Sequence, residues 1–355
     1  MRSCVVTLLI IHGALSIANW NNPKFIEMRD SLNKLAGCTW KAAINAGIPF
    51  DDDTALKKMC GSILKVPPQA SVAEEASKVN GLLSSSKNPR LLQTATSFDL
   101  RQVYPQCWSI SYVRDQSNCG SCWAVAAASS LSDRHCINSV KGGRLSQRSY
   151  SYQDLVECGT AAECGTGPNQ GCNGGFIYGG FLYAQRFGLV TGEGYQNFTT
   201  CKPYSFPPNR GGQNSVAPSC QRSCASAYPN SYTNDRVFTK GHAIVSPGGA
   251  SLRLIVQVAQ GAIQLRGSIV AGMEVFYDFY YYRSGVYKRS TLPSNYSLGG
   301  HAVRVIGWGR TSAGVDYWIV ANSWGPYWGQ NGYFWMIRGV NDCGFETYMV
   351  EGLLN

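Results

Sequence analysis

The chain has 355 residues, of which 44% are hydrophobic and 15% charged. It is therefore long and apolar enough to bury a large core, which excludes an intrinsically disordered protein. The formal net charge is +10, but Lys and Arg are scattered along the sequence and form no long run of like charge. Nucleic-acid binding is not expected from such a distribution, and a basic but unspecialised surface explains it better.

The N-terminus has the layout of a secretory signal peptide. Arg2 precedes an apolar stretch from Val5 to Leu15, and Ser16-Ile17-Ala18 supplies the small residues that a signal peptidase inspects. The stretch is shorter than the about 20 residues that span a bilayer, so we expect no stable membrane insertion. A buried N-terminal helix is the alternative. We expect residues 1–18 to be a signal peptide and the fourteen cysteines of the chain to form disulfides in an oxidising compartment.

The composition changes along the chain. Residues 19–93 contain two cysteines, Cys38 and Cys60, and a helix is expected from Lys24 to Leu35. A stretch rich in Ser and Lys follows, from Ser84 to Arg90, and loose polar segments of this kind are where domains join and proteases cut. We place a domain boundary near residues 92–96. A leader, a small region (19–93) and a domain rich in Cys, Gly and aromatic residues (94–355) together form the layout of an enzyme precursor.

The large domain divides into a helical half and a strand-rich half. Helices are expected over Trp123–Ile137, Phe176–Arg186 and Leu252–Gln260. Strands are expected at Ile269–Val270, Met273–Tyr282, Ala302–Trp308, Tyr317–Ala321 and Tyr333–Arg338, which are rich in β-branched and aromatic residues and are separated by Gly and Ser. This segregation predicts an α+β fold with two lobes.

The densest chemical motif runs from Gln116 to Trp123. A cysteine attacks a carbonyl as the thiolate, and Cys122 stands where the expected helix begins, so free N–H groups and the helix dipole favour its ionised form. Gln116 can supply a side-chain donor to an oxyanion. Cys119 and Cys122 also form a Cys-x-x-Cys, which suggests a redox pair or half of a zinc site. No second closely spaced Cys or His pair and no early βαβ unit support those alternatives, so no metal is expected.

The thiolate needs a base, and the chain contains only four histidines. His135 lies 13 residues after Cys122 on the same expected helix, which separates the two by about 20 Å. His301 follows two glycines and opens an expected strand. Asn322 follows it by 21 residues, on the next strand, where its amide can orient the imidazole without adding a charge. His301 is therefore the expected base and Asn322 its orienting partner.

These motifs together resemble the papain family of cysteine proteases, and its cathepsin B branch in particular. The run Cys119-Gly120-Ser121-Cys122-Trp123 with downstream His and Asn is the family signature. The resemblance covers residue 97 to the end and extends loosely to the region around Trp40 and Met59-Cys60-Gly61. It implies a papain-like two-lobed fold with the active-site cleft between a helical N-terminal lobe and a β-rich C-terminal lobe. It also implies that Cys122, His301, Asn322 and Gln116 are the catalytic residues.

The resemblance further implies how substrates bind and which cysteines pair. The implied substrate-binding residues are Gly120, Gly174, Gly175, Ile177, Gly272, Gly300, Ala302, Trp324 and Tyr348. The implied disulfides are Cys107–Cys136, Cys119–Cys172 and Cys201–Cys224. Three cysteines remain to be paired, Cys158, Cys164 and Cys220, and among them we expect the disulfide Cys158–Cys220. Cys164 is then left unpaired or bonded unexpectedly, and Cys343 is expected to be a buried thiol.

Two departures from cathepsin B bear on specificity. The stretch matching its occluding loop, Cys201–Cys220, contains no histidine to hold a terminal carboxylate, so we expect endopeptidase activity with little removal of C-terminal dipeptides. Tyr348 stands where cathepsin B has a glutamate that accepts arginine. Because an unpaired arginine is costly to bury, we expect apolar or aromatic side chains at the second residue before the cut.

We therefore expect a cysteine-type endopeptidase that is made as an inactive precursor and acts on protein and peptide substrates through a thiolate–imidazolium pair, without a cofactor. Its own propeptide and protein inhibitors of cysteine proteases are the expected partners, and a monomer is expected. Sequons at Asn197 and Asn295 are expected glycosylation sites. The compartment is left open among lysosome, vacuole, secretory granule and extracellular space. A catalytically silent binding protein and a thiol–disulfide oxidoreductase are the alternatives.

Overall fold

The computed structural model of the chain describes residues 22–45, 48–50, 52–64, 95–160, 169–208 and 215–355. The expected signal peptide (residues 1–18), most of the expected junction near 92–96 and Cys164 lie outside the described residues. No helix among the described residues is long and apolar enough to cross a membrane.

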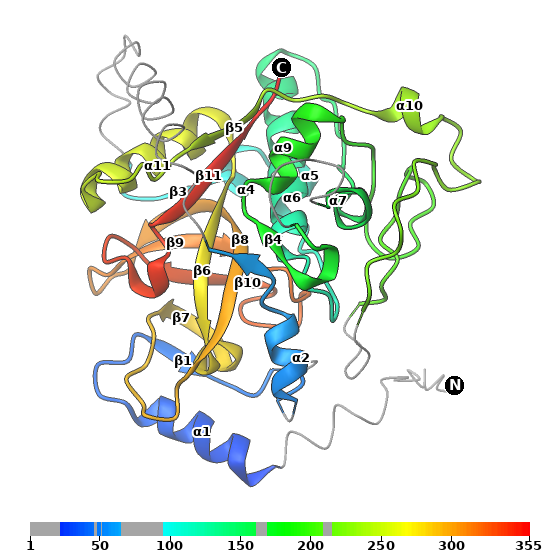
Figure 1. Cartoon of the computed structure of the whole chain (residues 1–355). Helices are drawn as coiled ribbons and strands as arrows, with labels where there is room; N and C mark the ends of the chain where they lie inside the picture. Colours follow the sequence, from blue (N-terminus) through cyan, green and yellow to red (C-terminus); the bar gives the residue numbers. More distant parts are fainter. Residues whose placement is uncertain (1–21, 46–47, 51, 65–94, 161–168, 209–214) are drawn as a thin grey trace, which may run out of the picture.

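The described residues form an α+β fold in which helices and strands are largely segregated (Figure 1). The α-helices are α1 (Pro23–Lys34), α2 (Asp53–Lys58), α4 (Leu100–Val103), α5 (Trp108–Ser111), α6 (Cys122–Lys141), α7 (Tyr152–Cys158), α9 (Gly179–Arg186), α10 (Tyr232–Asp235) and α11 (Leu252–Arg266). The strands are β1 (Trp40–Ala42), β2 (Ser62–Ile63), β3 (Phe98–Asp99), β4 (Gly175–Phe176), β5 (Gly241–Ile244), β6 (Ile269–Phe276), β7 (Tyr282–Tyr287), β8 (Ser297–Arg310), β9 (Asp316–Ala321), β10 (Tyr333–Ile337) and β11 (Tyr348–Leu353). Three 3₁₀ turns are η3 (Gly171–Asn173), η4 (Tyr277–Tyr281) and η5 (Asp342–Gly344).

One large sheet organises the C-terminal half. Its order is β1-β7-β10-β9-β8-β6-β11-β5, with β3 added to β8, and all neighbours are antiparallel except β10 and β7. The long strand β8 lies near the middle and pairs with β6 on one side and β9 on the other. A central strand is held on both edges, so a residue that it carries is placed firmly.

The helical lobe is built around α6, which packs against α7 and α9. Most of its residues are buried, including a run of alanines and serines that lets neighbouring elements approach closely. The apolar residues of this lobe form a cluster that extends to Val270, Ala302 and Val350 on the sheet. A second cluster fills the β-rich side.

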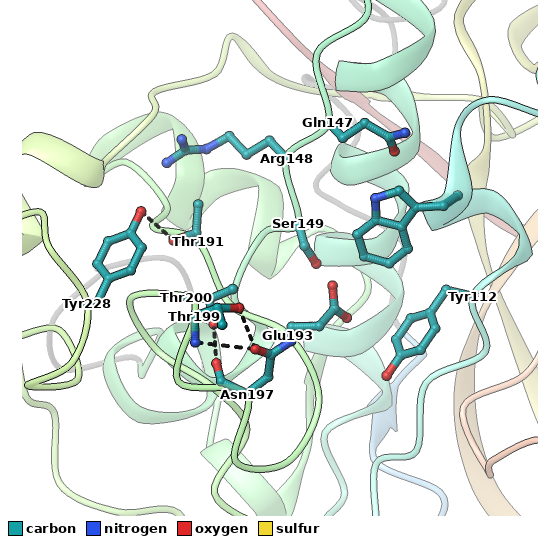
Figure 2. A pocket seen from close by; sticks show the side chains of 11 residues that line it. Tyr112, Gln147, Arg148, Ser149, Thr191, Glu193, Asn197, Thr199, Thr200 and Tyr228 are labelled. Atoms are coloured by element: carbon teal, nitrogen blue, oxygen red, sulfur yellow. Dashed lines mark hydrogen bonds between the residues drawn. The ribbon is translucent and has the colours of Figure 1, made fainter.

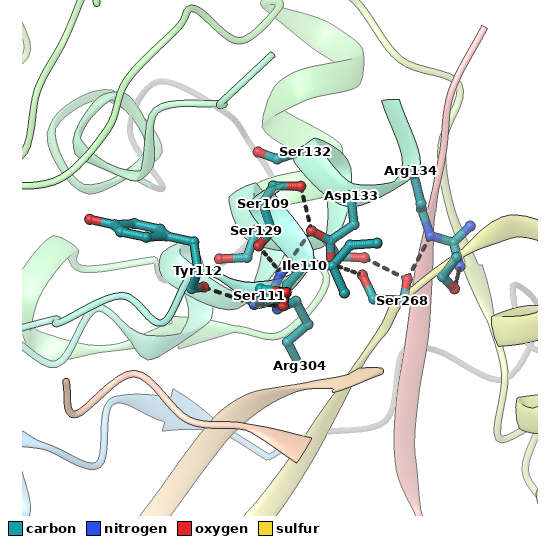
Figure 3. A network of polar contacts seen from close by, with 12 residues as sticks. Ser109, Ile110, Ser111, Tyr112, Ser129, Ser132, Asp133, Arg134, Ser268 and Arg304 are labelled. Carbon is teal, nitrogen blue, oxygen red and sulfur yellow. Dashed lines mark hydrogen bonds and ion pairs between the residues drawn. The ribbon is translucent and has the colours of Figure 1, made fainter. Parts of the chain in front are cut away.

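A buried ion pair joins the two lobes (Figure 3). Arg304 on β8 donates to both carboxylate oxygens of Asp133 on α6 over 2.7 Å, and its remaining donors reach main-chain carbonyls that include that of Ile110. Ser109 and Ser268 donate to the same carboxylate over 2.8 and 2.7 Å. Because every partner is satisfied at low exposure, the network fixes β8 relative to α6.

The N-terminal segment, residues 22–64 as far as described, adds to both lobes. Strand β1 extends the large sheet by pairing antiparallel with β7, with Trp40 opposite Gly285. Strand β2 pairs parallel with β4, with Ser62 opposite Gly175. The segment therefore runs from the far edge of the large sheet to the helical lobe.

The four expected disulfides are present: Cys107–Cys136, Cys119–Cys172, Cys158–Cys220 and Cys201–Cys224. Cys38, Cys60, Cys122 and Cys343 are free, and Cys343 is buried as expected. A set of four disulfides fits a protein that folds in the secretory pathway.

Several expected element bounds were wrong. The strand expected over Met273–Tyr282 ends at Phe276, because the chain turns there into η4 and begins β7 at Tyr282. The helix expected from Phe176 begins at Gly179, because Phe176 belongs to β4 and pairs with the N-terminal segment. Two helices are longer than expected, reaching Lys141 and Arg266.

Candidate active site

Cys122 is the first residue of α6 and is fully buried at the junction of the two lobes. Backbone N–H groups of Cys122, Trp123, Ala302 and Gly61 act on its sulfur. Ala302 follows His301 on β8, so strand and helix start meet at this sulfur. Cys119 of the Cys-x-x-Cys is bonded to Cys172 and cannot form a redox pair with Cys122.

His301 lies on β8, and Asn322 directly follows the end of β9, the strand paired with β8, rather than lying on that strand as expected. His301 Nε2 lies 2.8 Å from Asn322 Oδ1, and the backbone N–H of Ser323 donates to the same oxygen over 2.8 Å. That second donor identifies the oxygen as an acceptor, so Nε2 carries the proton. His301 Nδ1 is buried and has no hydrogen-bond partner among the described residues, which leaves it available to a group in the cleft.

Aromatic rings cover this pair. The ring of Trp324 lies 4.9 Å from that of His301, and Tyr280 stacks on Trp324 at 4.7 Å. His301 and Asn322 are almost fully buried. The rings therefore shield the hydrogen bond between them from water, which strengthens it.

Gln116 is held in one orientation beside Cys119, three residues before the start of α6. Its Oε1 accepts from the Ser323 hydroxyl over 2.6 Å, so the amide nitrogen must face the other way. That nitrogen donates to the carbonyl oxygens of Cys119 and Met59 over 2.8 and 3.2 Å. An amide donor fixed in this way near the start of α6 is a candidate to stabilise a developing oxyanion.

Residues 59–64, here called the covering segment, cross this site. The Gly175 N–H donates to the Gly61 carbonyl over 2.9 Å. Gly61 packs so closely on Gly120 that a Cβ on Gly61 would overlap the Gly120 backbone. The structure therefore brings the expected residues Gly120, Gly174 and Gly175 against a peptide chain that already lies in the cleft.

Comparison with known proteins agrees with this geometry. Residues 94–353 match the family model described as papain family cysteine protease. This chain belongs to the papain family of cysteine proteases. The protease is 41% identical over 266 residues to "Cathepsin B-like cysteine proteinase 1" of Ostertagia ostertagi, covering 72% of each chain. It is 40% identical over 264 residues to "Gut-specific cysteine proteinase" of Caenorhabditis elegans, covering 74% of each.

A solved precursor shares the fold of the protease. The structure of "proCathepsin B S9 from Trypanosoma congolense" superposes with a TM-score of 0.70 at 28% identity, covering 93% of this chain and 97% of that one. The protease is thus a cathepsin B-like cysteine peptidase with the papain-like α+β fold, and its N-terminal segment has a counterpart in precursor structures.

The apolar residues around Leu64 beside the active site are here called the apolar pocket. Leu64 of the covering segment enters it, since a Cβ on Gly272 would lie 2.7 Å from Leu64 Cδ2 and 3.1 Å from Tyr348 Cβ. Tyr348 and Gly272 face each other on β11 and β6, and Ile177 and Ala302 complete the apolar surroundings. Glu346 points elsewhere and accepts from the Trp318 indole over 3.0 Å.

Burial sets the protonation of Cys122 and His301 in this covered state. Burial raises the pKa of the Cys122 thiol to about 11, against the opposing effect of the surrounding N–H groups. Burial also lowers the pKa of His301 to about 4, although the Asn322 hydrogen bond opposes the shift. Both groups are therefore neutral near pH 7, in contrast to the ion pair expected of a working site.

Two residues that sequence reasoning missed position Gln116. Ser323 orients its side-chain amide, and the Tyr204 hydroxyl donates to its backbone carbonyl over 2.8 Å. Tyr204 lies in the stretch from Cys201 to Cys220, whose ends are tied by disulfides to Cys224 and Cys158. Ser323 was signalled only by its place next to Asn322. No group of three or more His, Cys, Asp or Glu side chains in the described part of the chain is arranged to hold a metal ion.

Proposed function

We propose that the protein is an endopeptidase that uses Cys122 as nucleophile, His301 as base and acid, Asn322 as orienting residue and Gln116 as oxyanion donor. The observation that carries the proposal is the bond from His301 Nε2 to Asn322 Oδ1. It leaves Nδ1 as the nitrogen that faces the cleft where the sulfur of Cys122 meets β8. An imidazole oriented in this way can take the thiol proton and return it to a leaving amine.

The reaction proceeds in two steps. The Cys122 thiolate attacks the scissile carbonyl, and the Gln116 amide with the Cys122 backbone N–H stabilises the oxyanion. The imidazolium of His301 protonates the amine as the C–N bond breaks, leaving a thioester on Cys122. His301 then removes a proton from water, which attacks the thioester and releases the acid and the free thiol.

The region before residue 94 acts as an inhibitory propeptide in this proposal. A substrate would place the residue two before its cut in the pocket beside Tyr348 and then pass Cys122. From its N-terminal end, the covering segment first contacts Gln116 at Met59 and then reaches the pocket at Leu64. Its chain direction is therefore opposite to that of a substrate. A reversed chain fills the cleft without aligning a peptide bond for attack. Removal of residues 19–93 would expose Cys122 and His301 to water and favour their charged forms.

Specificity follows from the apolar pocket and from the stretch Cys201–Cys220. Leu64 is an apolar occupant of the pocket, which supports a preference for apolar or aromatic side chains there. The histidine-free stretch supports internal cleavage with little removal of C-terminal dipeptides. Protein and peptide substrates, and protein inhibitors that enter the same cleft, are the partners of the mature enzyme.

The test is peptide-library profiling of the processed enzyme, with the Cys122→Ala variant as control. We expect cleavage within peptides, apolar or aromatic residues two before the cut, and no cleavage by the variant. Arginine as the preferred residue there, or dipeptide removal as fast as internal cleavage, would contradict the specificity. Full stability without any hydrolysis would instead favour the silent binding protein.

A further inference from the structure

A second pocket, with a volume of about 520 Å³, opens on the helical lobe and shares no residue with the Cys122–His301 cleft (Figure 2). Polar side chains from several segments of the chain line it, including Glu193 and Ser149, which Figure 2 labels. Its volume lies within the range of about 300–1,000 Å³ typical of small-molecule sites.

The pocket presents two buried polar atoms that lack partners. Glu193 is only 8% exposed, and its Oε1 makes no hydrogen bond among the described residues. Nε of Arg148 is likewise buried and without a partner there. A buried acceptor or donor left without a partner is costly, so both atoms favour a ligand that satisfies them.

The charges around the pocket balance. Arg148 pairs with Asp235, and Arg114 bonds to the Ser149 hydroxyl behind the pocket wall over 3.2 Å. Arg148 and Glu193 thus line the space with opposite charges, and Asp235 and Arg114 contact the lining residues Arg148 and Ser149. A cation would pair with Glu193 but would be repelled by the arginines. An anion would be repelled by Glu193. A neutral ligand whose groups both donate and accept suits both unpaired atoms.

Two aromatic rings complete the pocket. Trp108 and Tyr112 are 41% and 36% exposed, and their rings meet edge to face at 5.6 Å. Both line the pocket. Flat apolar rings next to paired donors and acceptors match a sugar ring, which has an apolar C–H face and a rim of hydroxyls. We propose that this pocket binds a saccharide.

The saccharide has two possible sources, because Asn197 of the first sequon also lines the pocket. Thr199 holds the Asn197 Oδ1 with a hydroxyl bond of 2.5 Å. The Asn197 side-chain nitrogen makes no hydrogen bond within the described residues. In contrast, the Asn295 nitrogen donates to the Ser290 carbonyl over 3.1 Å. The sugar is therefore either the glycan attached to Asn197 or one carried by another molecule.

The test uses the full chain with Cys122→Ala, made without glycosylation, and N,N′-diacetylchitobiose as the probe in calorimetry or saturation-transfer NMR. We expect binding that Trp108→Ala and Glu193→Gln each weaken at least about tenfold, as for loss of one ring contact or one buried hydrogen bond. Phe198→Ala is the matched control, because Phe198 is an exposed aromatic residue on the same loop that does not line the pocket. It should leave affinity unchanged. Thermal unfolding of each variant checks that it is folded.

No probe binding by the parent chain, or binding that neither pocket variant weakens, would overturn the proposal. Preferential binding of N-acetylarginine amide would also overturn it, in favour of a cation site. A second arm uses glycosylated protein with Thr199→Ala, which removes the sequon, against Thr199→Ser, which keeps it. Probe binding that appears only in Thr199→Ala supports the protein's own glycan as the occupant, and equal binding in both supports an outside source.

Discussion

Gln116 Nε2 donates to the carbonyl oxygen of Met59 over 3.2 Å, so the amide proposed to stabilise an oxyanion is engaged by the protein's own N-terminal segment. The same segment places Gly61 over the sulfur of Cys122 and Leu64 in the pocket beside Tyr348. In the proposed precursor, the N-terminal segment would thus inhibit by occupying the groups that would otherwise bind substrate.

The fit of Gly61 on Gly120 predicts a leaky precursor when Gly61 gains a side chain. We expect Gly61→Ala to weaken inhibition by at least about tenfold, because its Cβ would overlap the Gly120 carbonyl and force the segment away. The measurement is the inhibition constant of the isolated propeptide against mature enzyme. Gly248→Ala, where a Cβ meets open space, is the stability control on the mature chain. Equal inhibition by wild-type and variant propeptides would contradict the packing argument.

Acid should loosen the covering segment through His301. Because burial lowers the pKa of His301 to about 4, below its ordinary value of 6.5, the neutral form stabilises the covered state above about pH 6.5. That stabilisation is lost as the pH falls from 6.5 towards 4, since the uncovered imidazole binds a proton more readily. Hydrogen exchange at residues 59–64 of the Cys122→Ala precursor, corrected for intrinsic rates, should rise over this range. His301→Gln should flatten the dependence, and unchanged protection between pH 7 and 4 would count against it.

Asn322 is predicted to position His301 rather than to touch substrate. Asn322→Ala should lower kcat by at least about tenfold while changing KM little, because the imidazole loses its fixed orientation. The pH profile of kcat/KM should shift with it, which a purely structural loss would not produce. Asn234→Ala on the exposed part of α10 is the control. A normal profile in Asn322→Ala would remove Asn322 from the proposed site.

Tyr348 is predicted to set the preference at the second residue before the cut. Tyr348→Glu should raise kcat/KM for peptides with arginine at that position, relative to peptides with leucine there, by about 10- to 100-fold. The reason is that a carboxylate can pair with the buried guanidinium. Tyr348→Phe keeps the apolar wall and should leave the ratio unchanged. Ratios of kcat/KM on paired peptides measure both. If Tyr348→Glu changes kcat/KM for neither peptide, the side chain two before the cut binds elsewhere.

The Asp133–Arg304 pair is predicted to hold the lobes in register. Asp133→Asn leaves a buried guanidinium without its counter-charge and should cost about 3–5 kcal/mol of unfolding free energy. Asp316→Asn, at a partly exposed carboxylate that pairs with Arg310 and Arg338, should cost clearly less, because Asp316 remains in contact with water. Urea unfolding of the two variants gives the comparison, and equal losses would show that burial does not matter there.

The sequence by itself determined the chemistry and much of the scaffold. The start of α6 at Cys122 and the partnership of His301 with Asn322 follow from local spacing, because helix starts and adjacent strands are encoded over short stretches. The disulfide Cys119–Cys172 follows from the resemblance to the papain family. The other three disulfides were expected from the same resemblance, and the α+β fold was expected from the segregation of helical and strand-rich segments along the sequence.

Only the tertiary structure decided how distant segments meet. Three contacts show this: Ser62 pairs with Gly175, Leu64 lies beside Tyr348, and Ser323 donates to Gln116. Each joins residues more than 100 positions apart, and no periodic pattern in the sequence records such contacts. The observed bounds of β6 and α9 differ from the expected ones because η4 and β4 pack against the N-terminal segment. Burial, a property of the folded whole, then set the charges of Cys122 and His301.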